Sequence, residues 1–168
     1  MSSEWRDFYV ILATAAATLL GAMFVVASIA GRIVRKARAT QVGAFFTATV
    51  FHLAVVLFAC ALAMVPTLTP LAFGIVIGVG GLAGLAIASR AGLWIGRAAN
   101  VERADRLWYA AAPMVSYVLI VVAAALMVDG AAAGRETLAL ALGLLIAAGI
   151  RNAWDMIIFI VGQGENTP

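Results

Sequence analysis

Leu71–Ser89 reads LAFGIVIGVGGLAGLAIAS and contains no charged side chain. A helix needs about 20 mainly apolar residues to cross the ~30 Å hydrocarbon core of a bilayer, and this stretch meets that length. Four further stretches have the same character, namely Phe8–Ala30, Val42–Pro66, Leu107–Val128 and Thr137–Val161. We therefore predict an all-α polytopic membrane protein, a bundle of five transmembrane helices that forms a single domain over residues 1–168.

Composition agrees with this prediction. Hydrophobic residues make up 65% of the chain and the mean hydropathy is +1.08, which excludes an ordinary soluble domain. Within lipid only helices and closed barrels satisfy their own backbone groups. Barrel strands alternate with a period of two, and neither Val118–Met127 nor Leu138–Ala148 does so. Both runs are rich in Ala and Leu, which favour helix.

The basic residues between the stretches predict the orientation. Eight lie in the first and third connections, against two in the N-terminal segment and the fourth connection. The eight are Arg32, Arg35, Lys36, Arg38, Arg90, Arg97, Arg103 and Arg106, and the two are Arg6 and Arg135. We expect a multi-pass membrane protein with the N-terminus outside and the C-terminus in the cytoplasm. These basic side chains can contact the anionic headgroups of membrane lipids, so no nucleic acid partner is needed to account for them. A lipid-specific or nucleotide-binding role of the basic connections is the alternative.

Several residues near the ends of the stretches refine this picture. The first stretch is longer than the h-region of a signal peptide and its basic residues follow it, so we expect it to be retained. A proline at position 113 lies in the first two turns of the fourth stretch and predicts a kink. Asn100 is a candidate N-cap for that helix. The aromatic residues expected at the two interfaces are Trp5, Tyr9, Phe45, Trp94, Trp108 and Tyr109.

Small residues recur at helical spacing in two stretches. Candidate packing positions are Ala13, Ala17 and Gly21 in the first stretch and Gly74, Gly78, Gly81 and Gly84 in the third. Such positions let helix backbones approach closely in lipid. Two interpretations are open, packing within one chain and a contact between subunits of a homo-oligomer. The many small residues leave little room for a wide pore inside one chain.

Ionisable residues within the stretches are the candidates for function, because burying them in lipid is costly. His52 lies roughly 15 Å from the cytoplasmic end of the second stretch, and Arg151 and Asp155 lie roughly 21 and 27 Å into the fifth from outside. Arg151 and Asp155 are four residues apart and can pair, with Asn152 beside them.

Two interpretations of this group compete. In the first, Arg151 and Asp155 neutralise each other, and His52 bonds a carbonyl or Thr49. In the second, they flank a polar path in which Asp155 attracts cations or Arg151 favours anions, with His52 as a proton-sensitive element.

The sequence offers little for catalysis or cofactors. With one His and one Cys, Cys60, the chain has no evident triad or metal-ligand set. The glycines of the third stretch lack the GK[ST] of a phosphate loop. We expect no enzymatic activity, no metal and no cofactor.

The two ends of the chain resemble a known group. The N-terminal WRDFYVILATAAATLLGAMFVVASI and the C-terminal RNAWDMIIFI are similar to small bacterial multi-span membrane proteins, some of which are labelled "modulator of FtsH protease". The resemblance covers about a quarter of the chain. It implies a bacterial five-helix membrane protein, which we expect to be a multi-pass protein of the cytoplasmic (inner) membrane, and it transfers no catalytic residues.

The function expected from these features is an oligomeric channel-like or small transport protein for ions or a small polar solute. Its path would be flanked by His52, Arg151 and Asp155, between subunits or inside the bundle. The alternative is a non-conducting accessory or regulatory subunit of another membrane protein or of a membrane protease.

The charge asymmetry yields a topology prediction. In a variant without Cys60, a cysteine introduced at Gly134 is expected to react with an impermeant thiol reagent added to intact cells. A cysteine introduced at Ala99 is expected to react only after the membrane is permeabilised. The reverse labelling pattern would contradict the orientation.

Overall fold

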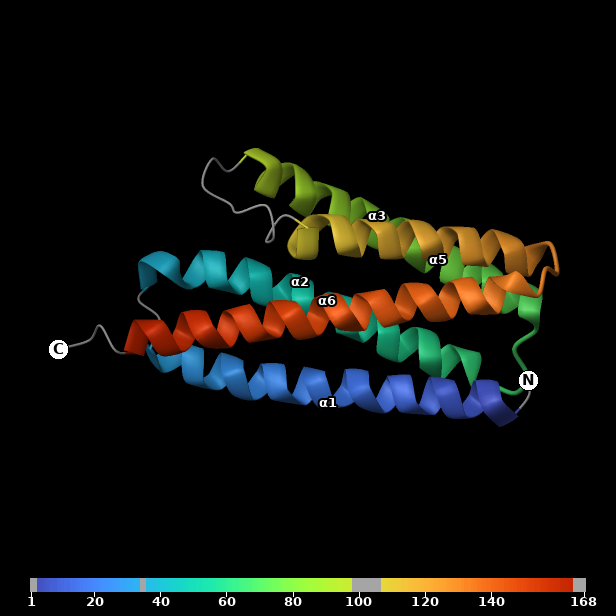
Figure 1. The fold of residues 1–168 in the computed structure, drawn as a ribbon, viewed down its shortest axis with the longest axis horizontal. Coiled ribbons are helices and arrows are strands. Elements are labelled where there is room, and N and C mark those ends of the chain that lie inside the picture. Colours follow the sequence, from blue (N-terminus) through green and yellow to red (C-terminus); the bar gives the residue numbers. More distant parts are fainter. Residues whose placement is uncertain (1–2, 34–35, 98–106, 165–168) are drawn as a thin grey trace.

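The computed structural model describes residues 3–33, 36–97 and 107–164. Within these ranges the chain forms long helices that run along a common axis (Figure 1). They are α1 (Ser3–Ile33), α2 (Lys36–Ala63), α3 (Pro70–Arg97), a short π-helix η1 (Leu107–Ala111) that continues into α5 (Ala112–Val128), and α6 (Ala133–Gly164). In the described part of the chain, five helices are long and apolar enough to cross a membrane. The predicted all-α class and the five helices of membrane-spanning length and composition are confirmed.

Most helices extend beyond the predicted stretches, as α3 does by continuing to Arg97, and two of the differences are informative. The second stretch was predicted to reach Pro66, but α2 ends at Ala63. Proline has no N–H for the helix ladder and disfavours helical backbone in the residue before it, so the helix stops ahead of it. The basic segment between the first two stretches was predicted as a loop, yet α1 continues to Ile33 and α2 starts at Lys36. The predicted N-cap Asn100 lies outside the described residues.

Helix α6 holds the central place in the bundle (Figure 1). It packs along α5 on one side and against α2 and α1 on the other, while α1 and α2 form one antiparallel pair and α3 and α5 another. The start of α1 and the end of α6 lie at opposite ends of the bundle, as an odd number of spans requires.

The glycines of α3 face α5. A Cβ at Gly81 would lie 2.8 Å from a methyl carbon of Ile120, and one at Gly74 would lie 3.2 Å from the carbonyl oxygen of Ala124. A Cβ at Gly84 would fall within the ring of Tyr117. Gly78 faces Ala124 in the same way. These four glycines therefore pack within one chain, which is the first of the two interpretations given above.

The small residues of α1 behave differently. Ala17 and Gly21 are exposed, and a Cβ at Gly21 would meet nothing within 4 Å. The face of α1 that packs on the bundle instead holds Tyr9, Ala16 and Met23, which are spaced by seven and are at most 2% exposed. Of the two interpretations, packing within the chain thus does not apply to Ala17 and Gly21, whereas Ala13 is partly buried against the core. A spacing of four drifts around the helix, whereas a spacing of seven stays on one face.

Gly134, the outer labelling position suggested by the sequence, is buried. A Cβ there would lie 2.8 Å from the Cγ of Met127 and 3.1 Å from the carbonyl oxygen of Ala123. The exposed Ala132, in the same connection between α5 and α6, is therefore the better position for the labelling cysteine.

The α3–α5 contact gives a stability prediction with an internal control. Gly84→Leu must displace the ring of Tyr117, and we expect a loss of roughly 1–3 kcal/mol in the free energy of unfolding, as overpacking costs. Gly80→Leu lies four residues earlier, where an added Cβ meets nothing within 4 Å, and is expected to leave stability unchanged. Thermal unfolding of the two variants in detergent tests this pair. Equal melting temperatures would show that α3 does not use this face against α5.

Candidate functional site

Polar side chains gather in one half of the bundle. We call this the polar half, meaning the half in which α5 begins and α6 ends, on the left in Figure 1. Four residues with polar side chains are buried in the described chain: Thr49 and His52 near the middle of α2, Ser116 in the first half of α5 and Asn152 in the second half of α6. The core of the other half is mainly apolar and includes Ala59, Cys60, Ala123, Leu138, Ala141 and Leu142.

His52 and Tyr117 join α2 to α5 near the middle of the bundle. The Nδ1 atom of His52 lies 2.7 Å from the hydroxyl oxygen of Tyr117, and both side chains are buried. The ring of the same tyrosine covers Gly84 of α3. The expectation that His52 bonds a carbonyl or Thr49 missed this partner. One aromatic side chain thus connects three helices, because the missing side chain at position 84 leaves room for its ring.

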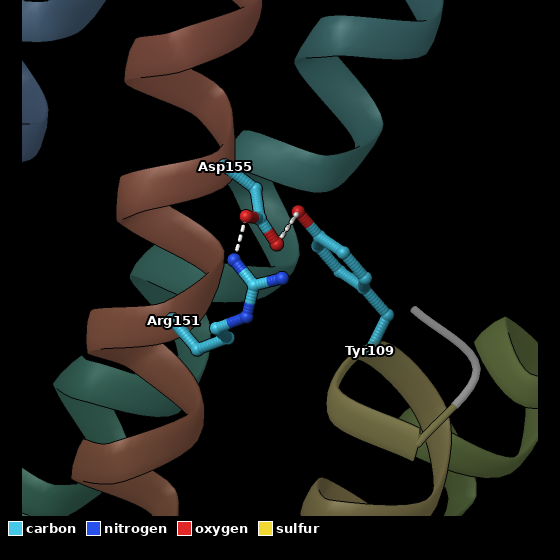
Figure 2. Close-up of polar contacts among 3 residues, drawn as sticks. All are labelled: Tyr109, Arg151 and Asp155. Atoms are coloured by element: carbon cyan, nitrogen blue, oxygen red, sulfur yellow. Dashed lines mark hydrogen bonds and ion pairs between the residues drawn. The ribbon is translucent and has the colours of Figure 1, made fainter. Parts of the chain in front are cut away.

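Arg151 and Asp155 form an ion pair on α6, one turn apart (Figure 2). The hydroxyl of Tyr109, from η1, donates a hydrogen bond of 3.4 Å to the other carboxylate oxygen of Asp155. The side chain of Arg151 is 37% exposed and that of Asp155 is 23% exposed, so this group reaches the surface of the bundle. The structure thus brings Arg151 and Asp155 together and adds Tyr109, which sequence reasoning assigned only to the membrane interface.

The π-helix η1 explains how Tyr109 reaches Asp155. Pro113 lies two residues after η1 and has no N–H to donate to the carbonyl of Tyr109, four residues earlier. Its ring also crowds that carbonyl, so regular α-helical bonding cannot continue there. The chain forms a wider π turn before α5, at the place where a kink was predicted. Single π turns of this kind are common at functional sites.

Asn152 is the exception among the buried polar groups. It is 3% exposed, and its Oδ1 atom has no hydrogen-bond partner among the described residues. Helical register places it between the Asp155 face and the face formed by Gly149 and Met156, which pack on Leu53 of α2. A buried acceptor without a donor is unfavourable, and such groups in native proteins call for an explanation.

His52 does not join the ion pair in any described contact. It bonds Tyr117, while Arg151 and Asp155 bond each other and Tyr109. The four polar candidates nevertheless lie on two helices that pack against each other, α2 and α6. The two tyrosines were the residues that sequence reasoning missed. One feature of the sequence could have indicated them. Each polar group within the membrane needs a hydrogen-bond partner, and a tyrosine hydroxyl on a neighbouring span can be that partner.

The described residues contain no group of three or more His, Cys, Asp or Glu side chains placed to hold a metal ion. Cys60 is buried with its thiol free. Comparison with protein-family models, curated proteins and solved structures finds no match. The candidate site is therefore described by its own geometry: the ion pair with Tyr109, the hydrogen bond of His52 to Tyr117, and the buried Oδ1 of Asn152, which has no partner among the described residues.

The ion pair yields a prediction for stability. Arg151→Leu or Asp155→Leu alone leaves an uncompensated charge in or near lipid, so each is expected to lower stability by more than the double variant does. A double-mutant cycle on unfolding in detergent is expected to show a coupling of about 0.5–3 kcal/mol. Strictly additive effects would show that the two side chains do not compensate each other.

Proposed function

We propose that this protein is a multi-pass protein of the bacterial cytoplasmic membrane that moves small ions or a small polar solute, as a channel-like or transport protein. The observation that supports this most is the convergence of polar side chains from α2, η1, α5 and α6 in one half of an otherwise apolar bundle. Polar groups inside a membrane are costly, and they commonly mark a solute or ion pathway.

The path we propose runs inside the bundle and not between subunits. The glycine stripe of α3 is covered by α5, so it is not free to form a subunit interface. His52, Arg151 and Asp155 lie instead among α2, α5 and α6. With the orientation expected from the basic residues, the polar half faces the cytoplasm and the group of Arg151, Asp155 and Tyr109 forms its mouth.

The apolar half closes the path in this conformation. Its core is filled by residues such as Cys60, Leu138 and Leu142, each fully buried. We propose that this packed region acts as a hydrophobic gate, which opens by separation of helices that meet there. The hydrogen bond of His52 to Tyr117 lies at the boundary between the two halves, where it ties α2 to α5.

A second candidate is a non-conducting accessory subunit of another membrane protein or of a membrane protease. The observation in its favour is the exposed small-residue face of α1 at Ala17 and Gly21, which no described helix of this chain covers. Such a face allows close approach of another helix in lipid. The resemblance of the chain ends to proteins labelled "modulator of FtsH protease" points the same way.

The transport proposal predicts measurable flux. Purified protein in liposomes is expected to pass an ion or a small polar solute faster than protein-free liposomes, and His52→Ala is expected to change the pH dependence of that flux. Leu140→Ala, an exposed position on α6, serves as the control and is expected to leave flux unchanged. If wild-type liposomes pass nothing above the lipid background and the protein purifies only with a foreign partner, the accessory candidate is favoured.

A further inference from the structure

Asn152 and its neighbours indicate which kind of solute the site takes. We infer that the site binds a small uncharged solute with hydrogen-bond donors and acceptors, of the size of urea or glycerol, and not an ion. This inference rests on the transport function proposed above. Its starting point is that the one buried polar atom without a partner in the described chain is a neutral acceptor, the Oδ1 of Asn152.

Charge balance argues against an ion. Among the described residues, Arg151 and Asp155 are the charged residues of the site, and each already compensates the other. A cation would have to compete with the guanidinium group for Asp155, and an anion would have to compete with the carboxylate for Arg151. A charge that enters a low-dielectric region without compensation is strongly unfavourable. The remaining contacts, the hydroxyls of Tyr109 and Tyr117, are uncharged and offer no further compensation.

Hydrogen-bonding capacity favours a neutral solute. The Oδ1 of Asn152 is an acceptor that needs a donor, which a solute N–H or O–H supplies. The guanidinium of Arg151 has five N–H donors in a planar fork, and it bonds Asp155, which lies one turn from Asn152 on α6. Urea and glycerol each carry both donors and acceptors. One such molecule can thus satisfy the amide oxygen and accept from the arginine without any change in net charge.

The exposure of the side chains gives the direction of entry. Arg151 and Asp155 are partly exposed, at 37% and 23%, whereas Asn152 is 3% exposed. Figure 2 shows the first two side chains extending from α6 toward Tyr109 of η1. A solute that enters beside the ion pair therefore reaches the amide next, before the hydrogen bond of His52 to Tyr117 at the middle of the bundle.

Osmotic swelling of liposomes that contain the full chain tests this inference. Urea and glycerol are the neutral probes, and potassium and chloride fluxes are measured on the same preparations. We expect wild-type protein to raise urea or glycerol entry above the lipid background and to leave both ion fluxes at that background. Asn152→Leu removes the acceptor at similar volume, and it is expected to lower the protein-dependent solute flux roughly threefold to tenfold, the effect of one lost hydrogen bond.

Two further variants keep the result interpretable. Thr14→Val removes a polar group from an exposed face of α1, where its hydroxyl bonds the carbonyl of Val10, and is expected to leave the flux unchanged. Asn152→Ala tests the same acceptor if the leucine variant fails to fold, and thermal unfolding is measured for each variant.

The other outcomes separate this inference from the proposed function. Flux of potassium or chloride without urea or glycerol would overturn the neutral-solute inference and leave the transport function in place. Solute flux that folded Asn152→Leu and Asn152→Ala both retain would overturn the assignment to Asn152. Absence of any protein-dependent flux would overturn both the inference and the transport function.

Discussion

The absence of water in the hydrocarbon core is the constraint on which the rest of this structure depends. Every backbone and side-chain polar group within a span must find its partner inside the protein. The backbone does so by forming helices over nearly the whole described chain. Exposed hydroxyls on α1 do so locally, as Thr14, Thr18 and Ser28 each bond the carbonyl four residues earlier. These groups are satisfied without any neighbour, so they are compatible with a lipid-facing surface.

The deeper polar groups need partners on other helices, and this need shapes the bundle. His52 meets Tyr117, and the ring of Tyr117 in turn occupies the space that Gly84 leaves on α3. Helix–helix contact in lipid depends on close packing and hydrogen bonds, since apolar burial gives no drive there. The polar contact between α2 and α5 and the glycine contact between α3 and α5 are therefore two parts of one arrangement. The Oδ1 of Asn152 takes no part in this arrangement. We therefore propose a bound solute, and not helix packing, as the reason for its burial.

The sequence predicts the fold well because span length and apolar composition are local properties. The five spans were found, and the main error, at Pro66, came from counting hydropathy past a residue that ends a helix. The pairing of Arg151 with Asp155 was also accessible, since a spacing of four fixes it within one helix. The partners of His52 and Asp155 could not be predicted from the sequence. Tyr117 and Tyr109 are brought near them by tertiary packing and by the π turn before Pro113. The small residues show the same limit: their spacing indicates a face suited to close packing but not the helix that covers it.

The most direct test of this account is the surroundings of Asn152 in a lipid bilayer. A density map of the protein in nanodiscs, at a resolution that shows ordered water, locates what lies against the amide. The account predicts water or solute density at hydrogen-bonding distance, about 2.7–3.2 Å, from Oδ1 and connected to the group of Arg151 and Asp155. A dry Asn152 whose amide oxygen accepts from another protein group, with apolar side chains between it and the ion pair, would contradict it.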